Sequence, residues 1–144
     1  MKHNFDFHTH STASDGSLSP AELVKKAAAE QVEFLSLTDH DTISGVAEAA
    51  GTAAEENIEF VSGLEISIDY SPGTFHLCGY SFDLRNRELN EALDYVQTAR
   101  KNRNSKIVGK LNELGIDITL EDVKKVAGPD QMGRPHFARV IIEK

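Results

Sequence analysis

The sequence contains one cysteine, no long apolar run and fewer basic than acidic residues. The lone Cys78 excludes an internal disulfide, and the cytoplasm is therefore the expected compartment. No apolar run approaches the roughly 20 residues that a membrane-spanning helix requires. The N-terminus also lacks the basic stretch and apolar core of a signal peptide. These absences predict a protein without membrane contact.

The charge balance limits the classes of partner. The 144 residues include 23 acidic and 15 basic side chains, which give a net charge of −8. Such a surface repels a nucleic-acid backbone over most of its area, so we expect no binding to duplex nucleic acid. Divalent cations gathered in one cavity would reverse the local sign. A phosphorylated small molecule or nucleotide therefore remains open as a substrate.

The order of the predicted elements indicates an α/β fold in one compact domain. Strands alternate with helices, which favours a mainly parallel sheet, and the last two strands flank the turn Ser71-Pro72-Gly73 as a hairpin. One helix begins with a capping box, in which Ser19 caps, Pro20 takes the first position and Glu22 reaches back. The expected strands are residues 2–7, 33–39, 58–63, 64–70 and 74–82, and the expected helices are residues 19–31 and 44–56.

After residue 84 the pattern becomes all-helical. One long helix is expected from Asn86 to Gly115, and a shorter one begins at Thr119. We therefore divide the chain into residues 1–84, an N-terminal βα half, and residues 85–144, a helical insert or cap. Five basic side chains of the long helix are predicted to form a solvated face, with a lid that attracts an anionic substrate as the alternative: Arg100, Lys101, Arg103, Lys106 and Lys110.

The stretch "DFHTHSTASDG", residues 6–16, concentrates metal-binding side chains on the first strand and the loop after it. Successive side chains of a strand point to opposite faces. Phe5 and Phe7 then share one face and can pack into a core. Asp6, His8 and His10 share the other face and are expected to enter one cavity together.

Further metal-capable residues follow the next strands. Functional side chains of α/β folds gather where strands end and loops begin, and His40 in "TDHDT" and Glu65 in "GLE" are placed there. Imidazoles and carboxylates without cysteine favour a catalytic metal site over a closed structural zinc site.

Five motifs in order, "DFHTHSTASDG", "LTDHDTISG", "GLEIS", "FHLCGYSFD" and "GRPHFA", resemble the polymerase and histidinol phosphatase (PHP) domain family. The resemblance is closest to its stand-alone bacterial phosphoesterases and extends from Phe5 to about Ala138. It implies a distorted barrel of seven βα units with two or three divalent metal ions, manganese, zinc or iron, at the C-terminal mouth of the strands.

The resemblance also implies the ligand set. Two histidines of the first strand would bind one ion, Asp15 and His40 would bind a second, and Glu65 would bridge ions. Asp15, His40 and Glu65 would then carry the catalysis. The implied metal ligands are His8, His10, Asp15, His40, Glu65 and His76.

Four more residues receive roles from the resemblance. Arg134 and His136 in "GRPH" would hold the substrate phosphate, with metal ligation by His136 as an alternative. Asp6 and Asp39 would orient the ligating imidazoles.

Structural roles are the alternatives for several of these residues. Asp15 before glycine suits a turn, and Asp39 could cap the segment that follows it. Arg134 could be an ordinary surface arginine. Asp41 is expected to be a cap or loop residue only.

The implied activity is metal-dependent hydrolysis of a phosphate monoester of a nucleotide or similar small molecule. Members of the family run to nearly double this length, and their second half supplies further strands and a late Asp-x-His pair. No histidine follows His136 here. We therefore expect a partial barrel that self-associates to cover its open side. The alternative function is a truncated, non-catalytic metal-binding or assembly module that needs a second chain to complete the barrel. A metal-dependent amide hydrolase on a related barrel is a third, less favoured interpretation.

Overall fold

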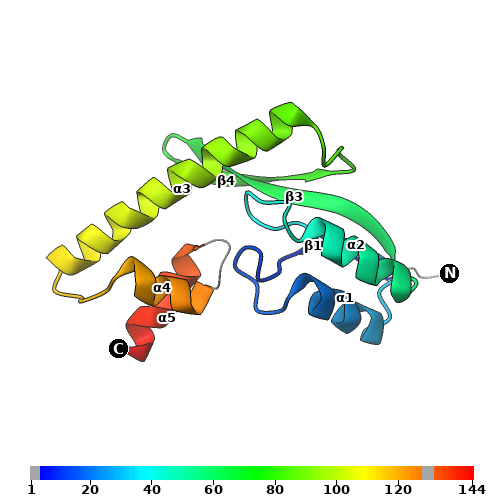
Figure 1. The fold of residues 1–144 in the computed structure, drawn as a ribbon, viewed down its shortest axis with the longest axis horizontal. Helices are drawn as coiled ribbons and strands as arrows, with labels where there is room; N and C mark the ends of the chain where they lie inside the picture. Colours follow the sequence, from blue (N-terminus) through cyan, green and yellow to red (C-terminus); the bar gives the residue numbers. More distant parts are fainter. Residues whose placement is uncertain (1–3, 128–131) are drawn as a thin grey trace.

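The computed structural model describes residues 4–127 and 132–144, which fold into the helices and strands drawn in Figure 1. The beginning of the first expected strand and Gly128 of the last expected short helix lie outside the described residues. None of the described helices is long and apolar enough to cross a membrane. In chain order the elements are β1 (Phe5–Thr9), α1 (Pro20–Ala29), β2 (Phe34–Leu37), α2 (Val46–Glu55), β3 (Glu59–Tyr70), β4 (Gly73–Tyr80), α3 (Arg87–Glu113), α4 (Leu120–Ala127) and α5 (Arg134–Glu143).

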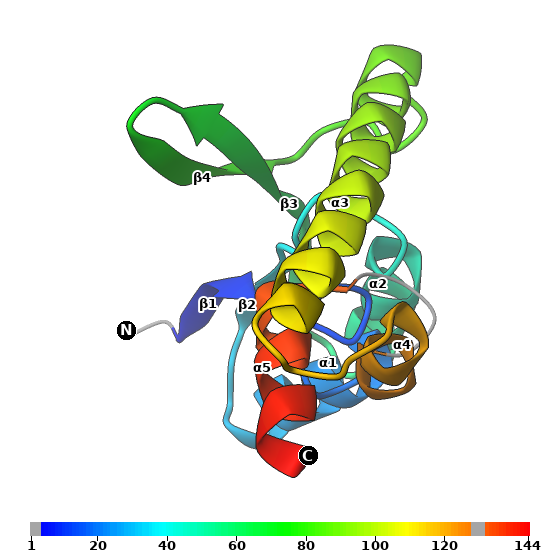
Figure 2. The same cartoon turned by 90° about the vertical axis from the view of Figure 1, so that its left-hand side faces the viewer.

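The four strands form one curled sheet in the order β1-β2-β3-β4. β1 pairs with β2 and β2 pairs with β3 in parallel, whereas β3 and β4 form an antiparallel hairpin. The predicted α/β class and the predicted hairpin are confirmed. In Figure 2 this hairpin projects away from the helices that cover the rest of the sheet.

β3 is one continuous strand, and the prediction of two separate strands at residues 58–63 and 64–70 was wrong. Its first residues pair with β2 as far as Ser62, and from Gly63 onwards it pairs with β4. A side chain at Gly63 would collide with the Ser36 hydroxyl and the Leu37 carbonyl. Glycine here marks a close approach of two backbones within a strand, not a strand end.

Helices α1 and α2 lie side by side on the sheet and bury its main core (Figure 1). α1 begins as predicted: the Ser19 hydroxyl accepts the Glu22 N–H at 3.2 Å, and the Glu22 carboxylate accepts the Ser19 N–H at 2.9 Å. The buried core residues are Val24, Ala27, Leu35, Leu37, Ala49, Ala53 and Ile58. This packing holds the strand ends, and hence the loops after them, in fixed positions.

The expectation that Phe5 and Phe7 pack into a core was wrong. Phe5 is 63% exposed and Phe7 is 38% exposed. Their rings stack on each other at 5.7 Å, and Phe7 also contacts the ring of Tyr80 at 6.2 Å. The pairing of β1 with β2 shifts register between Asp6 and Thr9, so strict alternation does not hold along this strand. The result is an exposed aromatic cluster, Phe5, Phe7 and Tyr80, beside the sheet.

Helices α3, α4 and α5 form a second, smaller packed unit. α3 is the long helix that runs across the molecule in Figures 1 and 2, and α4 and α5 lie beside its C-terminal end. The chain leaves α3 through Gly115, whose φ is 82°, as the sequence predicted. The buried apolar residues that pack together in this unit are Ile118, Val123, Phe137 and Val140. The predicted division of the chain at residue 85 stays a prediction.

Candidate metal centre

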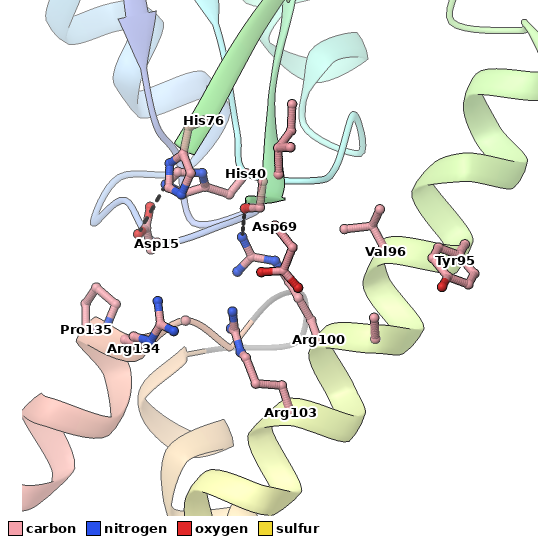
Figure 3. A pocket seen from close by; sticks show the side chains of 14 residues that line it. Asp15, His40, Asp69, His76, Tyr95, Val96, Arg100, Arg103, Arg134 and Pro135 are labelled. Atoms are coloured by element: carbon pink, nitrogen blue, oxygen red, sulfur yellow. Dashed lines mark hydrogen bonds and ion pairs between the residues drawn. The ribbon is translucent and has the colours of Figure 1, made fainter. Parts of the chain in front are cut away.

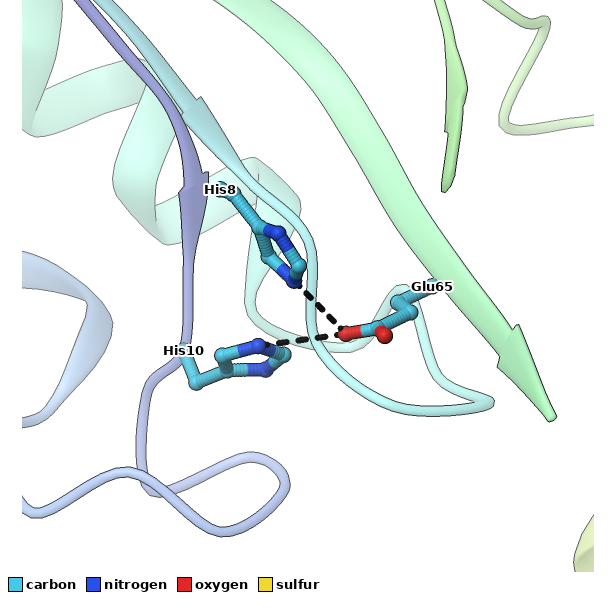
Figure 4. A group of neighbouring side chains, drawn as sticks. All are labelled: His8, His10 and Glu65. Carbon is cyan, nitrogen blue, oxygen red and sulfur yellow. Dashed lines mark hydrogen bonds and ion pairs between the residues drawn. The ribbon is translucent and has the colours of Figure 1, made fainter. Parts of the chain in front are cut away.

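Glu65 lies at the centre of a group of four histidines. Its Oε2 atom is 2.9 Å from Nε2 of His8 and 3.2 Å from Nε2 of His10 (Figure 4). The same oxygen is 3.5 Å from Nδ1 of His40. The second oxygen, Oε1, is 2.9 Å from Nδ1 of His76. One buried carboxylate therefore contacts side chains from β1, from β4 and from the loops after β1 and β2.

Backbone pairing beyond the end of β2 fixes this arrangement. An isolated parallel bridge joins His40 to Glu65. The Glu65 N–H donates to the Asp39 carbonyl at 3.2 Å, and the Asp41 N–H donates to the Glu65 carbonyl at 2.9 Å. The segment "TDHD" thus continues the sheet for one more step, which places His40 beside Glu65.

Asp15 extends the group beside His10 and His40. Its carboxylate oxygens lie 3.9 Å from Nδ1 of His10 and 3.8 Å from Nε2 of His40. The rings of His10 and His40 stack at 4.6 Å. Within each of three overlapping groups, ligand atoms lie within 4.8 Å of one another: His8, His10 and Glu65; His10, Asp15 and His40; His40, Glu65 and His76. All six predicted metal ligands therefore lie in one place.

Two buried nitrogen atoms in this group need a partner. Among the residues that the structure describes, Nδ1 of His10 and Nδ1 of His40 have no hydrogen-bond partner although both are buried. Burial lowers the pKa of His40, against the raising effect of the Asp15 and Glu65 carboxylates, so its ring favours the neutral form. Neutral imidazoles and ionised carboxylates are ligands for divalent transition metals. The donor set and the unpartnered nitrogens fit a divalent cation.

Asp39 contacts the loop that joins two candidate metal ligands, His10 and Asp15. Its buried carboxylate accepts the Ser11 N–H at 2.7 Å and the Ser11 and Ser14 hydroxyls at 2.6 Å each. Burial raises the pKa of Asp39, although these hydrogen bonds lower it. Within the described part of the chain the hydrogen bonds of this carboxylate go to the loop that presents His10 and Asp15. The role predicted for Asp39, to orient a ligating imidazole, stays a prediction.

Asp6 lies at the margin of the site. It is exposed, and its Oδ1 atom accepts the backbone N–H of His8 at 3.2 Å. This bond supports the irregular part of β1. The bond involves only the backbone of His8, whose imidazole contacts Glu65. The role predicted for Asp6, to orient a ligating imidazole, also stays a prediction.

A cavity of about 540 Å³ opens beside the ligands (Figure 3). Asp15, His40 and His76 line one side. Arginines from two helices of the second unit line the other side, and Figure 3 shows them extending toward the same space: Arg100, Arg103 and Arg134. The cavity is thus bordered by candidate metal ligands and by cations.

The two residues of "GRPH" differ in their contacts. Arg134 lines the cavity and, among the described residues, has neither a hydrogen bond nor an ion pair. His136 is buried, and its Nδ1 atom accepts the Gly133 N–H at 2.9 Å, which closes the first turn of α5. Burial lowers the pKa of His136, so that nitrogen stays an acceptor. The predicted phosphate contact of His136 and its alternative, metal ligation, stay predictions.

Asp41 has a larger structural role than sequence reasoning assigned to it. Its fully buried carboxylate accepts the Ser67 N–H at 2.7 Å and pairs with Nε of Arg100. Arg100 also donates to the Ser67 hydroxyl at 2.8 Å, and Gln97 donates to the Asp41 carbonyl at 3.0 Å. Asp41 therefore joins α3 to the loop that carries His40.

The prediction of a solvated basic face on α3 was wrong for two of its five residues. Arg100 is paired inside the protein and Arg103 lines the cavity, whereas the three lysines are exposed. The two arginines are three positions apart and so lie on the same side of the helix, one turn from each other. Gln97, a further three residues back, extends the same stripe. This spacing of three residues is the signal in the sequence from which one inward-facing side of α3 could have been predicted.

The arrangement suits the chemistry of a phosphate ester. Histidine and carboxylate ligands can hold cations that polarise phosphoryl oxygens, and arginine can bind the non-bridging oxygens through its planar fork. The two kinds of group border one cavity here.

Comparisons with known proteins agree with this chemistry. The profile of the PHP domain matches residues 6–118. A 5'-3' exoribonuclease of Haemophilus influenzae is 38% identical over 143 residues, which are 99% of this chain and 52% of that protein. A 3',5'-nucleoside bisphosphate phosphatase of Chromobacterium violaceum is 35% identical over 141 residues, 97% of this chain and 50% of that protein.

Two solved structures share the fold of this chain. One is a protein described as an amidohydrolase from Chromobacterium violaceum, with bound sulfate, which superposes with a TM-score of 0.91 at 35% identity. The match covers 97% of this chain and 50% of that protein's chain. A protein assigned as a metal-dependent phosphoesterase from Bifidobacterium adolescentis superposes with a TM-score of 0.90 at 27% identity, over 98% of this chain and 50% of its own. The chain spans about half the length of the relatives it matches.

Proposed function

This chain belongs to the PHP domain family, and we propose that it carries the metal centre of a phosphoesterase that hydrolyses a phosphate monoester of a nucleotide or similar small molecule. The observation that supports this best is the group around Glu65, where six candidate ligands border a cavity lined by arginines. The names of two relatives, a nucleoside bisphosphate phosphatase and an exoribonuclease, favour a nucleotide substrate. The cytoplasm remains the compartment that the single cysteine predicts.

Two or three divalent ions, manganese, zinc or iron, would be held by the six candidate ligands, with Glu65 shared between them. When bound, such ions supply positive charge beside the phosphate and make a water molecule easier to deprotonate. Asp15 and His40 face the cavity and would border the phosphate to be cleaved. Arg134 would bind its non-bridging oxygens, and Asp39 would keep the loop that presents Asp15 in place.

The helical unit would close the site on its second side. Arg100, Arg103 and Arg134 all come from residues 85–144, so we propose that this segment acts as a cap over the metal ligands. In that role the cap excludes water from the cavity and places cations opposite the ligands.

We expect the protein, purified without chelator or added metal, to contain at least one divalent ion per chain and to release phosphate from adenosine 3',5'-bisphosphate. The measurements are elemental mass spectrometry and a phosphate assay before and after treatment with a chelator. The variant Asp15→Asn should lose phosphate release because a ligand at the cavity becomes neutral. A cyclic amide is the control substrate, and its preferential hydrolysis would contradict the proposal.

A non-catalytic module is the second candidate function, favoured by the exposed aromatic cluster of Phe5, Phe7 and Tyr80. Metal binding without phosphate release by the isolated chain would support this candidate, in which a second polypeptide completes the site. Substoichiometric metal would contradict both functions.

We further propose that the aromatic cluster is covered by self-association. Phe5→Asp should then shift the sedimentation coefficient of the protein toward that of a monomer, because a charge would have to be buried in the contact. The matched control is Ile142→Asp, which alters an exposed apolar residue of α5 that is 84% accessible and does not belong to the aromatic cluster. Equal sedimentation of the unsubstituted protein and the Phe5→Asp variant would contradict self-association through this cluster.

A further inference from the structure

The two outer strands of the sheet are joined by a side chain. β1 and β4 lie at opposite edges of the four-stranded sheet, with β2 and β3 between them. The Tyr80 hydroxyl, at the end of β4, nevertheless donates to the Phe7 carbonyl of β1 at 2.8 Å. The rings of these two residues lie 6.2 Å apart. The curl of the sheet therefore brings its two edges together at one point, and Tyr80 bridges them.

The bridge ends on the peptide group that joins Phe7 to His8. The pairing of β1 with β2 shifts register in this stretch, so that Phe7 and His8 together oppose Ser36 alone. Such a bulge disrupts the ladder of hydrogen bonds between two strands and changes the direction of the local side chains. Here the Phe7 carbonyl accepts from Tyr80, and the His8 N–H donates to Oδ1 of Asp6 at 3.2 Å. Side chains thus hold the backbone of His8 where the ladder is irregular.

Packing does little to fix the His8 side chain. It is 55% exposed, and its Nε2 atom lies 2.9 Å from Oε2 of Glu65 (Figure 4). A half-exposed imidazole has several accessible rotamers, so its position depends on how its backbone is held. Of the two side chains that hold this backbone, Asp6 belongs to the same strand, whereas Tyr80 ties His8 to β4.

The same bridge relates His8 to a second candidate ligand, His76. Tyr80 and His76 are four residues apart on β4 and so point to the same face of the strand. His76 lies 2.9 Å from Oε1 of Glu65, while His8 contacts the other oxygen of that carboxylate. The bond from Tyr80 to the Phe7 carbonyl and the contacts through Glu65 therefore both connect β1 with β4. A fixed separation of these strands keeps both imidazoles within reach of one carboxylate.

We propose that Tyr80 is a positioning residue of the metal centre, whose hydroxyl holds the Phe7–His8 peptide so that the His8 imidazole can ligate an ion together with His10 and Glu65. The inference rests on the proposed function, because it takes the group around Glu65 to bind divalent ions. Tyr80 acts through the backbone of a ligand and does not touch the ion.

The test compares Tyr80→Phe with Tyr70→Phe. Each variant removes one hydroxyl from the β3–β4 hairpin and keeps the aromatic ring, so the apolar surface is retained. Tyr70 is 64% exposed, and its hydroxyl has no hydrogen bond among the described residues. Its ring contacts Phe75 at 6.0 Å, a contact that phenylalanine also makes. Cobalt(II) is titrated into the metal-free protein, because its visible absorption reports both the affinity and the geometry of the ligands.

We expect Tyr80→Phe to weaken the binding of one cobalt ion by about 10- to 100-fold, the usual effect of losing a group that orients a metal ligand. The absorption of the bound ion should also change, whereas Tyr70→Phe should stay within about twofold of the unsubstituted protein. In a His8→Ala background the effect of Tyr80→Phe should disappear, because no imidazole is left for Tyr80 to position. Urea unfolding of the metal-free variants checks that the fold is kept.

The inference is overturned if Tyr80→Phe binds cobalt as tightly as Tyr70→Phe does. It is also overturned if the loss of affinity is equally large with and without His8, since Tyr80 would then be a general support of the fold. The fate of the proposed function is measured separately, as phosphate release by the metal-loaded protein. Metal binding that depends on Tyr80 without phosphate release would contradict hydrolysis and leave the positioning role in place. Phosphate release with unchanged cobalt binding in Tyr80→Phe would do the reverse, and an unsubstituted protein that binds no cobalt would contradict both.

Discussion

Glu65→Gln is expected to empty the metal centre while leaving the fold intact. Burial alone would raise the pKa of Glu65, but the hydrogen bond from His8 and the charges of His40 and His8 bring it below its usual value. The carboxylate is therefore ionised at neutral pH, and its two oxygens contact four imidazoles. Glutamine has the same shape but no charge and only one acceptor oxygen, so it cannot be shared between ions.

Loss of a group that merely orients a metal ligand costs about 10- to 100-fold in metal affinity, and loss of a shared ligand should exceed that range. We expect manganese or zinc to raise the midpoint of thermal unfolding of the unsubstituted protein and to have little effect on Glu65→Gln. Elemental mass spectrometry should show the same loss of metal. The control is Glu59→Gln, an exposed glutamate at the start of the same strand. Undiminished metal content in Glu65→Gln would show that Glu65 is not a ligand.

Several elements of the fold could be predicted from local signals. The capping box of α1, the hairpin turn at residues 71–73 and the glycine after α3 each depend on a few neighbouring residues, and the structure shows all three. The clustering of the six candidate ligands was also accessible, because parallel strands bring their C-terminal ends to one edge of the sheet. His8 lies near the end of β1 and His40 in the loop after β2, whereas Glu65 lies within β3, just beyond the part that pairs with β2.

Features that depend on contacts across the fold could not be read in the same way. The exposure of Phe5 and Phe7 depends on what covers the sheet, and alternation along a strand contains no such information. The continuity of β3 depends on the change of its partner from β2 to β4 at Gly63, where the sequence shows only a glycine. The local sequence pattern predicts where helices and strands lie. What each strand pairs with, and what covers each face of the sheet, depends on the tertiary structure.

Asp41 shows the same limit at the candidate site. In the sequence it is one acidic residue of "TDHDT", and its partner Arg100 lies 59 positions away. Its φ of 54° is in the left-handed region, which aspartate tolerates better than most residues. The local pattern therefore explained Asp41 as a loop residue, and only the packing of α3 shows its second role.

Asp41→Asn is expected to lower the free energy of unfolding by about 3–5 kcal/mol, the usual effect of removing one partner of a buried ion pair. The Arg100 side chain is only 12% exposed and the Asp41 side chain is fully buried, so water cannot replace the lost carboxylate. Asparagine still tolerates the left-handed backbone and can accept the Ser67 N–H, which confines the change to the charge. Urea unfolding gives the free energy, and Arg100→Met in the same background should recover part of the loss because it removes the unpaired cation.

The matched control is Glu143→Gln, which makes the same chemical change in an exposed pair with Arg139, where the side chains are 57% and 68% accessible. That variant should stay within about 0.5 kcal/mol of the unsubstituted protein, as exposed ion pairs usually do. If Asp41→Asn were equally mild, Asp41 would not be what holds α3 against the loop of His40. If it is severe, the position of Arg103 opposite the metal ligands depends on Asp41, since Arg100 and Arg103 share one rigid helix. Asp41→Asn should then also weaken binding of adenosine 3',5'-bisphosphate, although Asp41 itself does not line the cavity.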